Sequence, residues 1–256
     1  MRLLVTRPEP DAAELKAQLI ARGHEVLIEP LVTISFDDCD PIDLEGIQAL
    51  IATSRNGLRA LARRPIVGQA RALPVFAVGP GTAATARALG FEHVIQGSSG
   101  ARELVALIVE RAEVNGGPLL HLAGDRLAFD FAPELKRLGF HLVRPVVYAT
   151  AAANRLSGST VSRLRDGRID GVLLLSPRTA DIYASLISRH ALESAARQVI
   201  HLCLSAAVAN RLAPLGPVKA AVATQPSLQE ILALVARIAP QSAEREAPGN
   251  NERTIT

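Results

Sequence analysis

Short apolar runs alternate with segments of helical periodicity along most of the chain. Each apolar run is followed by a turn and then by apolar residues at intervals of three and four. Uninterrupted short runs of this kind are typical of parallel strands that are buried on both faces. We predict strands at 3–5, 49–52, 75–78, 94–95, 119–122, 171–175, 200–204 and 220–222, and helices at 12–22, 57–63, 82–89, 102–112, 131–138, 179–188, 207–215 and 228–238. The pattern therefore predicts an α/β fold.

The same series of elements occurs twice. Gly23 ends the first predicted helix and Gly139 ends the fifth, 116 residues later, while Ser54 and Ser176 each follow a strand at an offset of 122. A slowly drifting offset is what a duplicated unit with insertions and deletions in its loops would produce. We interpret the chain as a duplication, although short apolar patterns also align by chance.

Two β-prone segments lie outside this rhythm. Residues 31–34 follow Pro30 and residues 146–149 follow Pro145, so each begins after a turn. We predict that these segments pair with each other as a connector. From residue 241 onward the chain lacks the apolar content needed to order itself, so residues 241–256 are predicted to be a disordered tail.

Composition excludes several classes of protein. The hydrophobic fraction of 48% and the charged fraction of 21% are ordinary for a globular chain, and no apolar run reaches the length of a membrane span. The first residues pass from a short apolar run into charge, unlike a signal peptide, so we expect a cytoplasmic protein. A net charge of +3, 3% aromatics and no run of basic residues argue against nucleic-acid binding. Two cysteines and six scattered histidines predict neither a disulfide scaffold nor a metal site.

Candidate binding residues follow the predicted strands. In open α/β sheets, ligands bind beyond the carboxyl ends of strands, where helix N-termini present free N–H groups. The residues at these positions are small, hydroxylic or basic throughout the chain. For each hydroxyl alone, capping of a helix is the favoured interpretation, and only the repetition favours anion binding. The candidates are Thr6, Arg7, Ser54, Arg55, Gly79, Gly81, Thr82, Ser98, Ser99, Gly124, Asp125, Ser176, Arg178, Thr179, Ser205 and Ala206.

Known catalytic motifs contribute little. The Gly79-x-Gly81 pair lacks the third glycine of a dinucleotide fingerprint. Asp125 could be a general acid or base, but we favour a place in the first turn of a helix. Tyr148, one of two tyrosines, lies in the predicted connector. Its phenol could donate a proton in a cleft, or its ring could pack beneath the connector.

Taken in order, several short motifs resemble the uroporphyrinogen-III synthase family over residues 1–240. They are Val-Thr-Arg-Pro at 5–8, Gly-x-Glu-Val at 23–26, Thr-Ser-Arg-Asn-Gly at 53–57, Ala-Val-Gly-Pro-Gly-Thr-Ala at 77–83, Val-Val-Tyr at 146–148 and Leu-Ser-Pro-Arg-Thr at 175–179. The resemblance implies two flavodoxin-like parallel-sheet domains with a cleft between them and a two-stranded β connector. The implied domains are 1–33 with 150–240 and, separately, 37–145, and the implied connectors are 31–36 and 146–150.

The resemblance also implies a reaction. Hydroxymethylbilane would be cyclised to uroporphyrinogen III, with inversion of ring D and loss of water, in the biosynthesis of haem, sirohaem, cobalamin and chlorophyll. No metal or organic cofactor is implied. Tyr148 matches the tyrosine proposed to assist departure of the hydroxyl, and Ser176 and Thr82 match hydroxyl residues that face the cleft. The chain departs from the family at 205–208, Ser-Ala-Ala-Val, where many members have glycine followed by threonines.

The expected partners are few. The resemblance implies a monomer that binds a linear tetrapyrrole and no nucleic acid or membrane, with transient contact to the preceding pathway enzyme as a further interaction. The alternative is a cytosolic two-lobed binding or sensor protein for a small anionic ligand, without catalysis.

Overall fold

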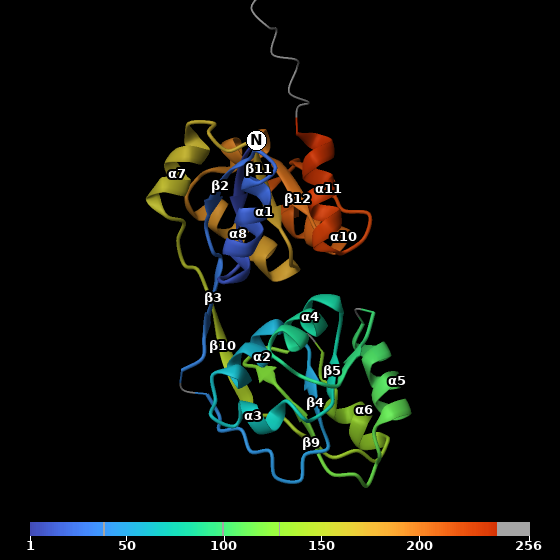
Figure 1. Cartoon of the computed structure of the whole chain (residues 1–256). Coiled ribbons are helices and arrows are strands. Elements are labelled where there is room, and N and C mark those ends of the chain that lie inside the picture. Colours follow the sequence, from blue (N-terminus) through green and yellow to red (C-terminus); the bar gives the residue numbers. More distant parts are fainter. Residues whose placement is uncertain (38, 99, 128, 240–256) are drawn as a thin grey trace, which may run out of the picture. The chain divides into compact units, whose positions relative to one another are not determined.

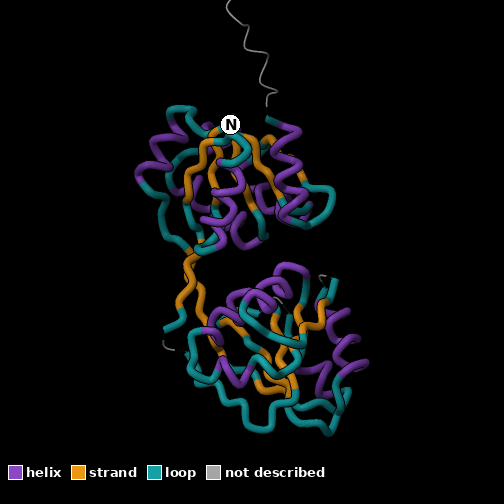
Figure 2. The backbone as a smooth tube through the Cα atoms, in the orientation of Figure 1, coloured by secondary structure: helices purple, strands orange, loops and turns teal. Residues whose placement is uncertain are grey.

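Two compact units make up the part of the chain that the computed structural model describes, which is residues 1–37, 39–98, 100–127 and 129–239 (Figures 1 and 2). Unit 1 comprises Met1–Thr33 and Ala152–Thr256, and unit 2 comprises Ile34–Ala151. The boundary between the two units falls within the strand Val146–Ala152, and the domain limits implied by the family resemblance, 1–33 with 150–240 and 37–145, stay a prediction.

Unit 1 is a parallel sheet with helices on both faces. Leu3 and Val5 pack against helices on one face, and Leu4 packs against helices on the other, as the unbroken apolar run predicts. The strand order is β13-β12-β11-β1-β2, with β1 (Arg2–Val5), β2 (Glu25–Ile28), β11 (Gly171–Leu174), β12 (Ile200–Cys203) and β13 (Lys219–Val222). One face carries α1 (Asp11–Ile20) and α11 (Leu228–Ile238), and the other carries α7 (Gly158–Arg165), α8 (Pro177–Arg189), α9 (Glu193–Gln198), α10 (Ala206–Ala209) and the 3-10 helix η1 (Asn210–Leu215).

Unit 2 has the same construction. Ile51 packs with helices on one face of its sheet, and Leu50 and Ala52 pack with helices on the other. The strand order is β6-β5-β4-β7-β9, with β4 (Ala49–Ala52), β5 (Val75–Ala77), β6 (Val94–Gln96), β7 (Leu119–His121) and β9 (Leu142–Val143). One face carries α5 (Ala101–Arg111) and α6 (Ala132–Arg137), and the other carries α2 (Arg55–Ala62), α3 (Val67–Ala70) and α4 (Pro80–Ala88). The prediction of an α/β chain with parallel sheets is confirmed.

The two sheets correspond strand by strand. The offsets found in the sequence pair β1 with β7 and β4 with β11, and with this pairing both sheets have the same strand order. The chain enters unit 2 at β4, so the order of strands along the chain is circularly permuted relative to unit 1. In each sheet the direction of strand addition reverses once, between β1 and β11 in unit 1 and between β4 and β7 in unit 2. Such a switch point is where open α/β sheets bind ligands.

A third, smaller sheet has the order β3-β10-β8, formed by β3 (Val32–Ser35), β10 (Val146–Ala152) and β8 (Ala123–Gly124). The predicted pairing of the two β-prone segments is therefore confirmed. The N–H of Ala153 donates to the Leu31 carbonyl and the N–H of Asp40 to the Val146 carbonyl, both at 3.0 Å, so β3 and β10 run antiparallel. The structure adds β8 as a third strand, because the chain leaves the unit 2 sheet at Leu122 and then pairs with β10.

One expected helix and two other expectations remain to be compared with the structure. The prediction of one helix at 207–215 is wrong, because α10 ends at Ala209 and η1 contains Pro214, which has no N–H for an α-helical hydrogen bond. The predicted tail at 241–256 lies outside the described residues, and the cleft between the two sheets stays a prediction. Within the described ranges, no helix combines the length and the apolar character of a membrane span.

Candidate functional site

The switch point of unit 2 brings together the ends of β4 and β7. Thr53 directly follows β4, and its hydroxyl oxygen lies 3.1 Å from Nε2 of His121, the last residue of β7. Ser54 follows Thr53, and Gly124 and Asp125 follow β7 through the short strand β8. Candidate residues far apart in the sequence therefore lie at one edge of one sheet.

Tyr148 lies against this edge from β10. A Cβ atom added to Gly124 would come within 2.6 Å of Cε2 and Cζ of the Tyr148 ring and 2.9 Å of its hydroxyl oxygen. The ring is buried, with 9% of the residue exposed, and it packs with Leu50, Leu122 and Val147. Packing beneath the connector is thus part of its role. Gly124, predicted to bind substrate, lies directly against the ring, and a side chain at this position would require the ring to shift.

Two neighbours act on the Tyr148 phenol besides its burial. Burial raises the pKa of the phenol, a hydrogen bond with the Ser54 hydroxyl opposes that increase, and the negative charge of Asp125 adds to it. The net effect is a raised pKa, so the phenol is protonated at neutral pH. The pair of Tyr148 and Ser54 is therefore a neutral proton donor with a hydrogen-bond partner.

Ser54 also caps a helix. Its hydroxyl oxygen accepts a hydrogen bond from the N–H of Asn56 at 3.1 Å, at the start of α2. The capping interpretation is confirmed for this residue. Because the hydroxyl still has its proton to donate, capping is compatible with the hydrogen bond to Tyr148.

Asp125 fixes β8 against β10. Its carboxylate accepts hydrogen bonds from the N–H and the hydroxyl of Thr150, both at 3.0 Å, and its own N–H donates to the Tyr148 carbonyl at 3.0 Å. The expectation that Asp125 belongs to the first turn of a helix is wrong, because the next helix begins at Ala132. The residue is exposed, so its charge remains accessible next to the phenol.

The remaining candidate residues of unit 2 differ in their burial and in their hydrogen-bond partners. Gly81 lies against Arg55, whose Nη2 would be 3.0 Å from an added Cβ, so these two candidates are neighbours. Gly79 is the buried N-cap residue of α4, and Thr82 in its first turn is 7% exposed. Ser98 is bound to Glu103 through both its N–H and its hydroxyl. Ser99 lies outside the described residues.

At the switch point of unit 1, the candidate groups are mostly engaged within the fold. The Thr6 hydroxyl is fully buried and donates to the Leu173 carbonyl at 2.7 Å, which joins β1 to β11. Arg7 forms an ion pair with Asp11 at 2.8 Å. Both side chains thus hold the edge of the sheet together, whatever they bind in addition.

The helices that begin at this edge of unit 1 differ at their N-termini. Ser176 caps α8, where its hydroxyl oxygen accepts from the Thr179 N–H at 3.1 Å, so capping is confirmed there too. Arg178 is half-buried in the first turn of α8. Ser205 precedes α10 but makes no side-chain capping bond, and Ala206 is exposed. The loop after β12 therefore offers mainly backbone donors.

His121 is the site residue that the sequence analysis misses. The side chain is 1% exposed, and its ring meets Phe131 edge to face with the centroids 5.3 Å apart. Burial lowers the pKa of His121 to about 4, and the positive charge of Arg144 adds to the effect. The imidazole is therefore neutral at neutral pH. The available signal was a histidine within the buried run Leu119–Leu122, just before a strand end.

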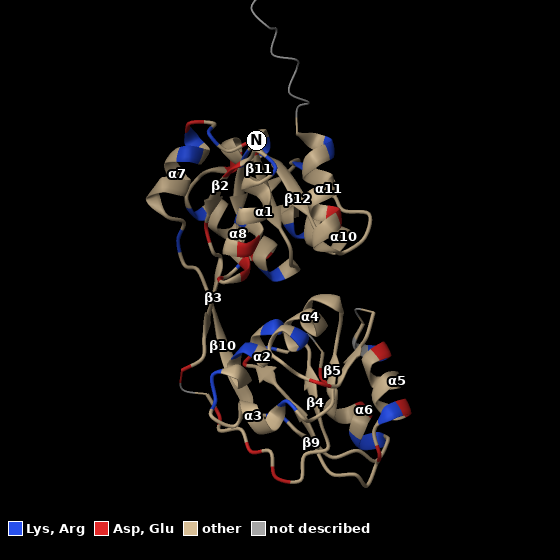
Figure 3. Ribbon diagram, in the orientation of Figure 1, with Lys and Arg blue, Asp and Glu red and all other residues tan. Residues whose placement is uncertain are grey.

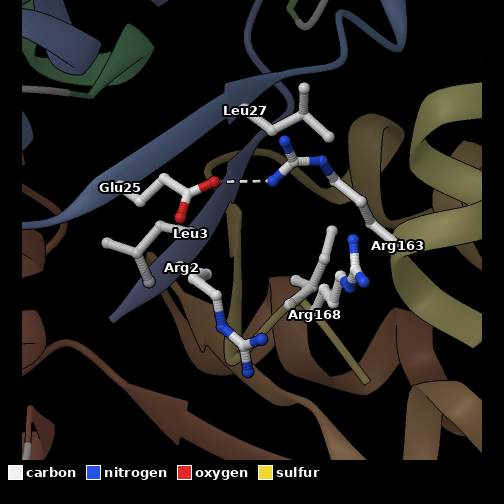
Figure 4. A pocket seen from close by; sticks show the side chains of 7 residues that line it. Arg2, Leu3, Glu25, Leu27, Arg163 and Arg168 are labelled. Atoms are coloured by element: carbon white, nitrogen blue, oxygen red, sulfur yellow. Dashed lines mark hydrogen bonds and ion pairs between the residues drawn. The ribbon is translucent and has the colours of Figure 1, made fainter. Parts of the chain in front are cut away.

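Two hollows lie away from these loops. One is at the amino edge of the unit 1 sheet (Figure 4), where Arg163 pairs with Glu25 at 2.6 Å and Arg2 pairs with Asp170 at 2.5 Å, so two of its arginines are neutralised. The other, of about 320 Å³, lies in unit 2 beside α3 and between residues 42–45 and 66–73. Figure 3 shows that basic and acidic residues occur along the ribbons of both units. Within the described ranges, no three His, Cys, Asp or Glu side chains are grouped to hold a metal ion.

Comparison with known proteins gives a consistent family assignment. The sequence profile of the family described as uroporphyrinogen-III synthase HemD matches residues 13–233. Among solved structures, uroporphyrinogen-III synthetase from Helicobacter pylori is similar with a TM-score of 0.60 and 17% identity, over 93% of this chain and 99% of that one. A mutant uroporphyrinogen III synthase from Thermus thermophilus is similar with a TM-score of 0.51 and 17% identity, over 93% and 98%. No curated protein sequence matches the chain.

At 17% identity these structural likenesses support the fold alone, and the profile match carries the assignment because it covers most of the 256 residues. The chain belongs to the uroporphyrinogen-III synthase family.

Proposed function

We propose that this protein is a lyase that cyclises hydroxymethylbilane to uroporphyrinogen III, with inversion of ring D and loss of water, in tetrapyrrole biosynthesis. The single observation that carries the proposal is the family match over residues 13–233. The arrangement of Tyr148, Ser54 and Gly124 at a switch point supports it, because it offers an acid where the fold binds ligands. By family resemblance we further propose a monomeric, cytoplasmic enzyme.

The first chemical step is loss of the substrate hydroxyl. The lone pair of the adjacent pyrrole nitrogen pushes out the hydroxyl, and the C–O bonding pair leaves with the oxygen. We propose that Tyr148 donates its proton to this oxygen, which departs as water and leaves the azafulvene in its N-protonated, positively charged and electrophilic form beside the tyrosinate. The Ser54 hydroxyl, through its hydrogen bond to the phenol, stabilises the negative charge that grows on Tyr148.

A phenol with a raised pKa is a weak acid, so the nitrogen lone pair supplies most of the driving force and Tyr148 assists. The larger task is geometric. Closure in solution joins the terminal ring without inversion, whereas type III product requires attack at the substituted carbon of ring D, a spiro intermediate, and reclosure. Holding the chain ends in that orientation is the main contribution that we propose for the protein.

The substrate carries acetate and propionate groups, which need anion donors. In each unit, the loops at the carboxyl edge of the sheet provide helix N-termini and small residues that let a carboxylate approach the backbone. We propose that Gly79, Gly81 and Thr82 bind carboxylates in unit 2 and that the loop after β12 does so in unit 1. Arg55 and Arg178, at the starts of α2 and α8, add charge-assisted hydrogen bonds to these groups.

One observation favours a non-catalytic alternative. The segment Ser205–Val208 lacks the threonines that many family members have, and Ser205 makes no capping bond with its side chain. If a hydroxyl there were needed for chemistry, the chain would be an anion-binding or sensor protein of the same fold. We favour the enzyme, because backbone donors remain in that loop and Tyr148 lies in the other unit.

The test is to supply purified protein with hydroxymethylbilane, without added cofactor, and to separate the isomers of the product. The enzyme yields type III isomer faster than type I forms spontaneously. Type I product alone, at the spontaneous rate, would reject the enzyme, and tight binding of hydroxymethylbilane in that case would favour the sensor.

A further inference from the structure

Thr53 and His121 form a pair whose chemistry the mechanism above does not use. Both lie at the switch point of unit 2, with 3.1 Å between the Thr53 hydroxyl oxygen and Nε2 of His121. His121 is buried, while Thr53 is half-buried and thus retains access to the loop surface. The pair therefore connects the core of unit 2 to the edge where ligands bind in this class of sheet.

The direction of this hydrogen bond depends on which ring nitrogen carries the proton. Nδ1 of His121 is buried and has no hydrogen-bond partner among the residues that the structure describes. If Nδ1 carried the proton, a buried N–H would be left unpaired, which proteins rarely tolerate, whereas an unpaired acceptor is tolerated more often. The ring also makes an edge-to-face contact with Phe131, which adds no acceptor. The geometry thus favours protonation of Nε2.

The charge of the ring is also settled by its surroundings. Arg144 and Asp130 are the charged groups that act on His121, and they pair with each other at 2.6 Å. Burial and the positive charge of Arg144 hold the pKa of His121 at about 4. The imidazole is therefore neutral and has one N–H, which donates to Thr53.

We infer that His121 is a positioning residue: its Nε2–H donates to the Thr53 hydroxyl oxygen, so that the Thr53 proton is directed outward to a carboxylate of the substrate. A threonine hydroxyl has one proton and accepts through its oxygen lone pairs. With the oxygen accepting from His121, the proton is the free donor at the end of β4. The identity of the anion as an acetate or propionate group rests on the proposed function, whereas the tautomer and the direction of the hydrogen bond do not.

A spectroscopic experiment tests the tautomer without any substrate. In protein labelled with ¹⁵N-histidine, two-dimensional NMR correlates the ring nitrogens with the ring carbon-bound protons and separates the two neutral tautomers. His121, assigned by its loss in His121→Phe, is expected in the Nε2-protonated form near neutral pH. Observation of the Nδ1-protonated form overturns the inference, because Thr53 would then donate its proton inward.

A binding series tests the donor. The probe is uroporphyrinogen III under anaerobic conditions, with the KM for hydroxymethylbilane measured in parallel. Thr53→Val, which keeps the shape and removes the hydroxyl, should raise Kd and KM about tenfold and leave kcat within about twofold, as expected for one hydrogen bond to a charged group. Thr53→Ser retains the hydroxyl and should bind within about twofold of the wild type.

His121→Phe separates positioning from packing, since the ring volume is kept and the N–H is lost. In protein that retains Thr53, His121→Phe should raise the Kd about threefold. Added to Thr53→Val, it should cause no further change in Kd, because the two changes act through one hydrogen bond. If Thr53→Val alone binds uroporphyrinogen III with the same Kd as the wild type, the inference is overturned. If the wild type binds uroporphyrinogen III, with Kd raised in Thr53→Val, but forms no type III product, the inference stands and the proposed function fails.

Discussion

Replacement of Gly124 by alanine tests whether the position of the Tyr148 ring matters for the reaction. The added Cβ would lie 2.6 Å from Cε2 and Cζ of the ring and 2.9 Å from its hydroxyl oxygen. Non-bonded carbon atoms rest about 3.5–4.0 Å apart, so the ring must move by about 1 Å. A displacement of this size can lower the rate of a positioned catalytic group about 100-fold. Overpacking at this site should also reduce the free energy of unfolding by about 1–3 kcal/mol.

The matched control is Gly68→Ala. Gly68 lies in α3 of the same unit, and a Cβ added there meets no atom within 4 Å. This variant should retain the wild-type kcat, and it should be slightly more stable because alanine favours a helix over glycine.

The assay is the initial rate of type III product formation, with urea unfolding measured on the same preparations. Tyr148→Phe should also lower kcat. General acids typically contribute 100-fold or more to a rate, and a phenol with a raised pKa is a weak acid at the lower limit of that range, so we expect a decrease of about 100-fold at most. The double variant Gly124→Ala, Tyr148→Phe should be little slower than either single variant, since both remove the same contribution. If Gly124→Ala is destabilised as expected but keeps the wild-type kcat, Tyr148 has only a packing role and the proposed acid is refuted.

Other predictions concern stability. The pKa of His121 is about 4 in the folded protein, against an ordinary value of 6.5. The neutral ring therefore contributes fully to the free energy of unfolding above pH 6.5, and about 3 kcal/mol is lost as the pH falls to 4. Urea unfolding at a series of pH values should show that His121→Phe lacks this loss, and a pH profile identical to that of the wild type would contradict the assignment. The hydrogen bond from Arg2 lowers the pKa of Asp170, so its contribution is present above the ordinary pKa of 3.8 and is lost as pH falls through the lowered value. Asp170→Asn should therefore differ from the wild type in thermal midpoint at neutral pH and converge with it in strong acid, whereas a constant difference would count against the ion pair. Ser227 caps α11 through the Glu230 N–H at 3.1 Å, so Ser227→Ala should cost about 1 kcal/mol in urea unfolding, and Ser227→Gly less.

The buried strands are the part of the fold that can be predicted best from the sequence. Val5, Leu50 and Leu173 are buried and belong to uninterrupted apolar runs. A strand that is buried on both faces is apolar at every position, so it stands out in the sequence as such a run. Edge strands are harder. β2 and β9 border their sheets and are not predicted as strands. In β2 the exposed Glu25 precedes a short run, Val26–Ile28, that is only partly buried, and β9 has two residues, of which Val143 is exposed.

The candidate site is predictable only in part, because hydrogen-bond partners come from distant segments. The position of Ser54 after a strand follows from the sequence, but its contact with Tyr148 needs β10 to lie beside β8. The sequence places Asp125 in a helix because acidic residues often begin one, and the pairing of β8 with β10 prevails there instead. For His121 the sequence offers only its place within the apolar run Leu119–Leu122, and its contact with Thr53 comes from a distant segment.

The isomer ratio of the product formed from hydroxymethylbilane, followed as protein concentration is increased, is the decisive measurement for the proposed function. We predict that the type III fraction rises with enzyme until it dominates over spontaneous type I, and that at equal concentration Tyr148→Phe gives a lower fraction than the wild type. A product that remains type I at every protein concentration would show that the protein does not direct the inversion of ring D.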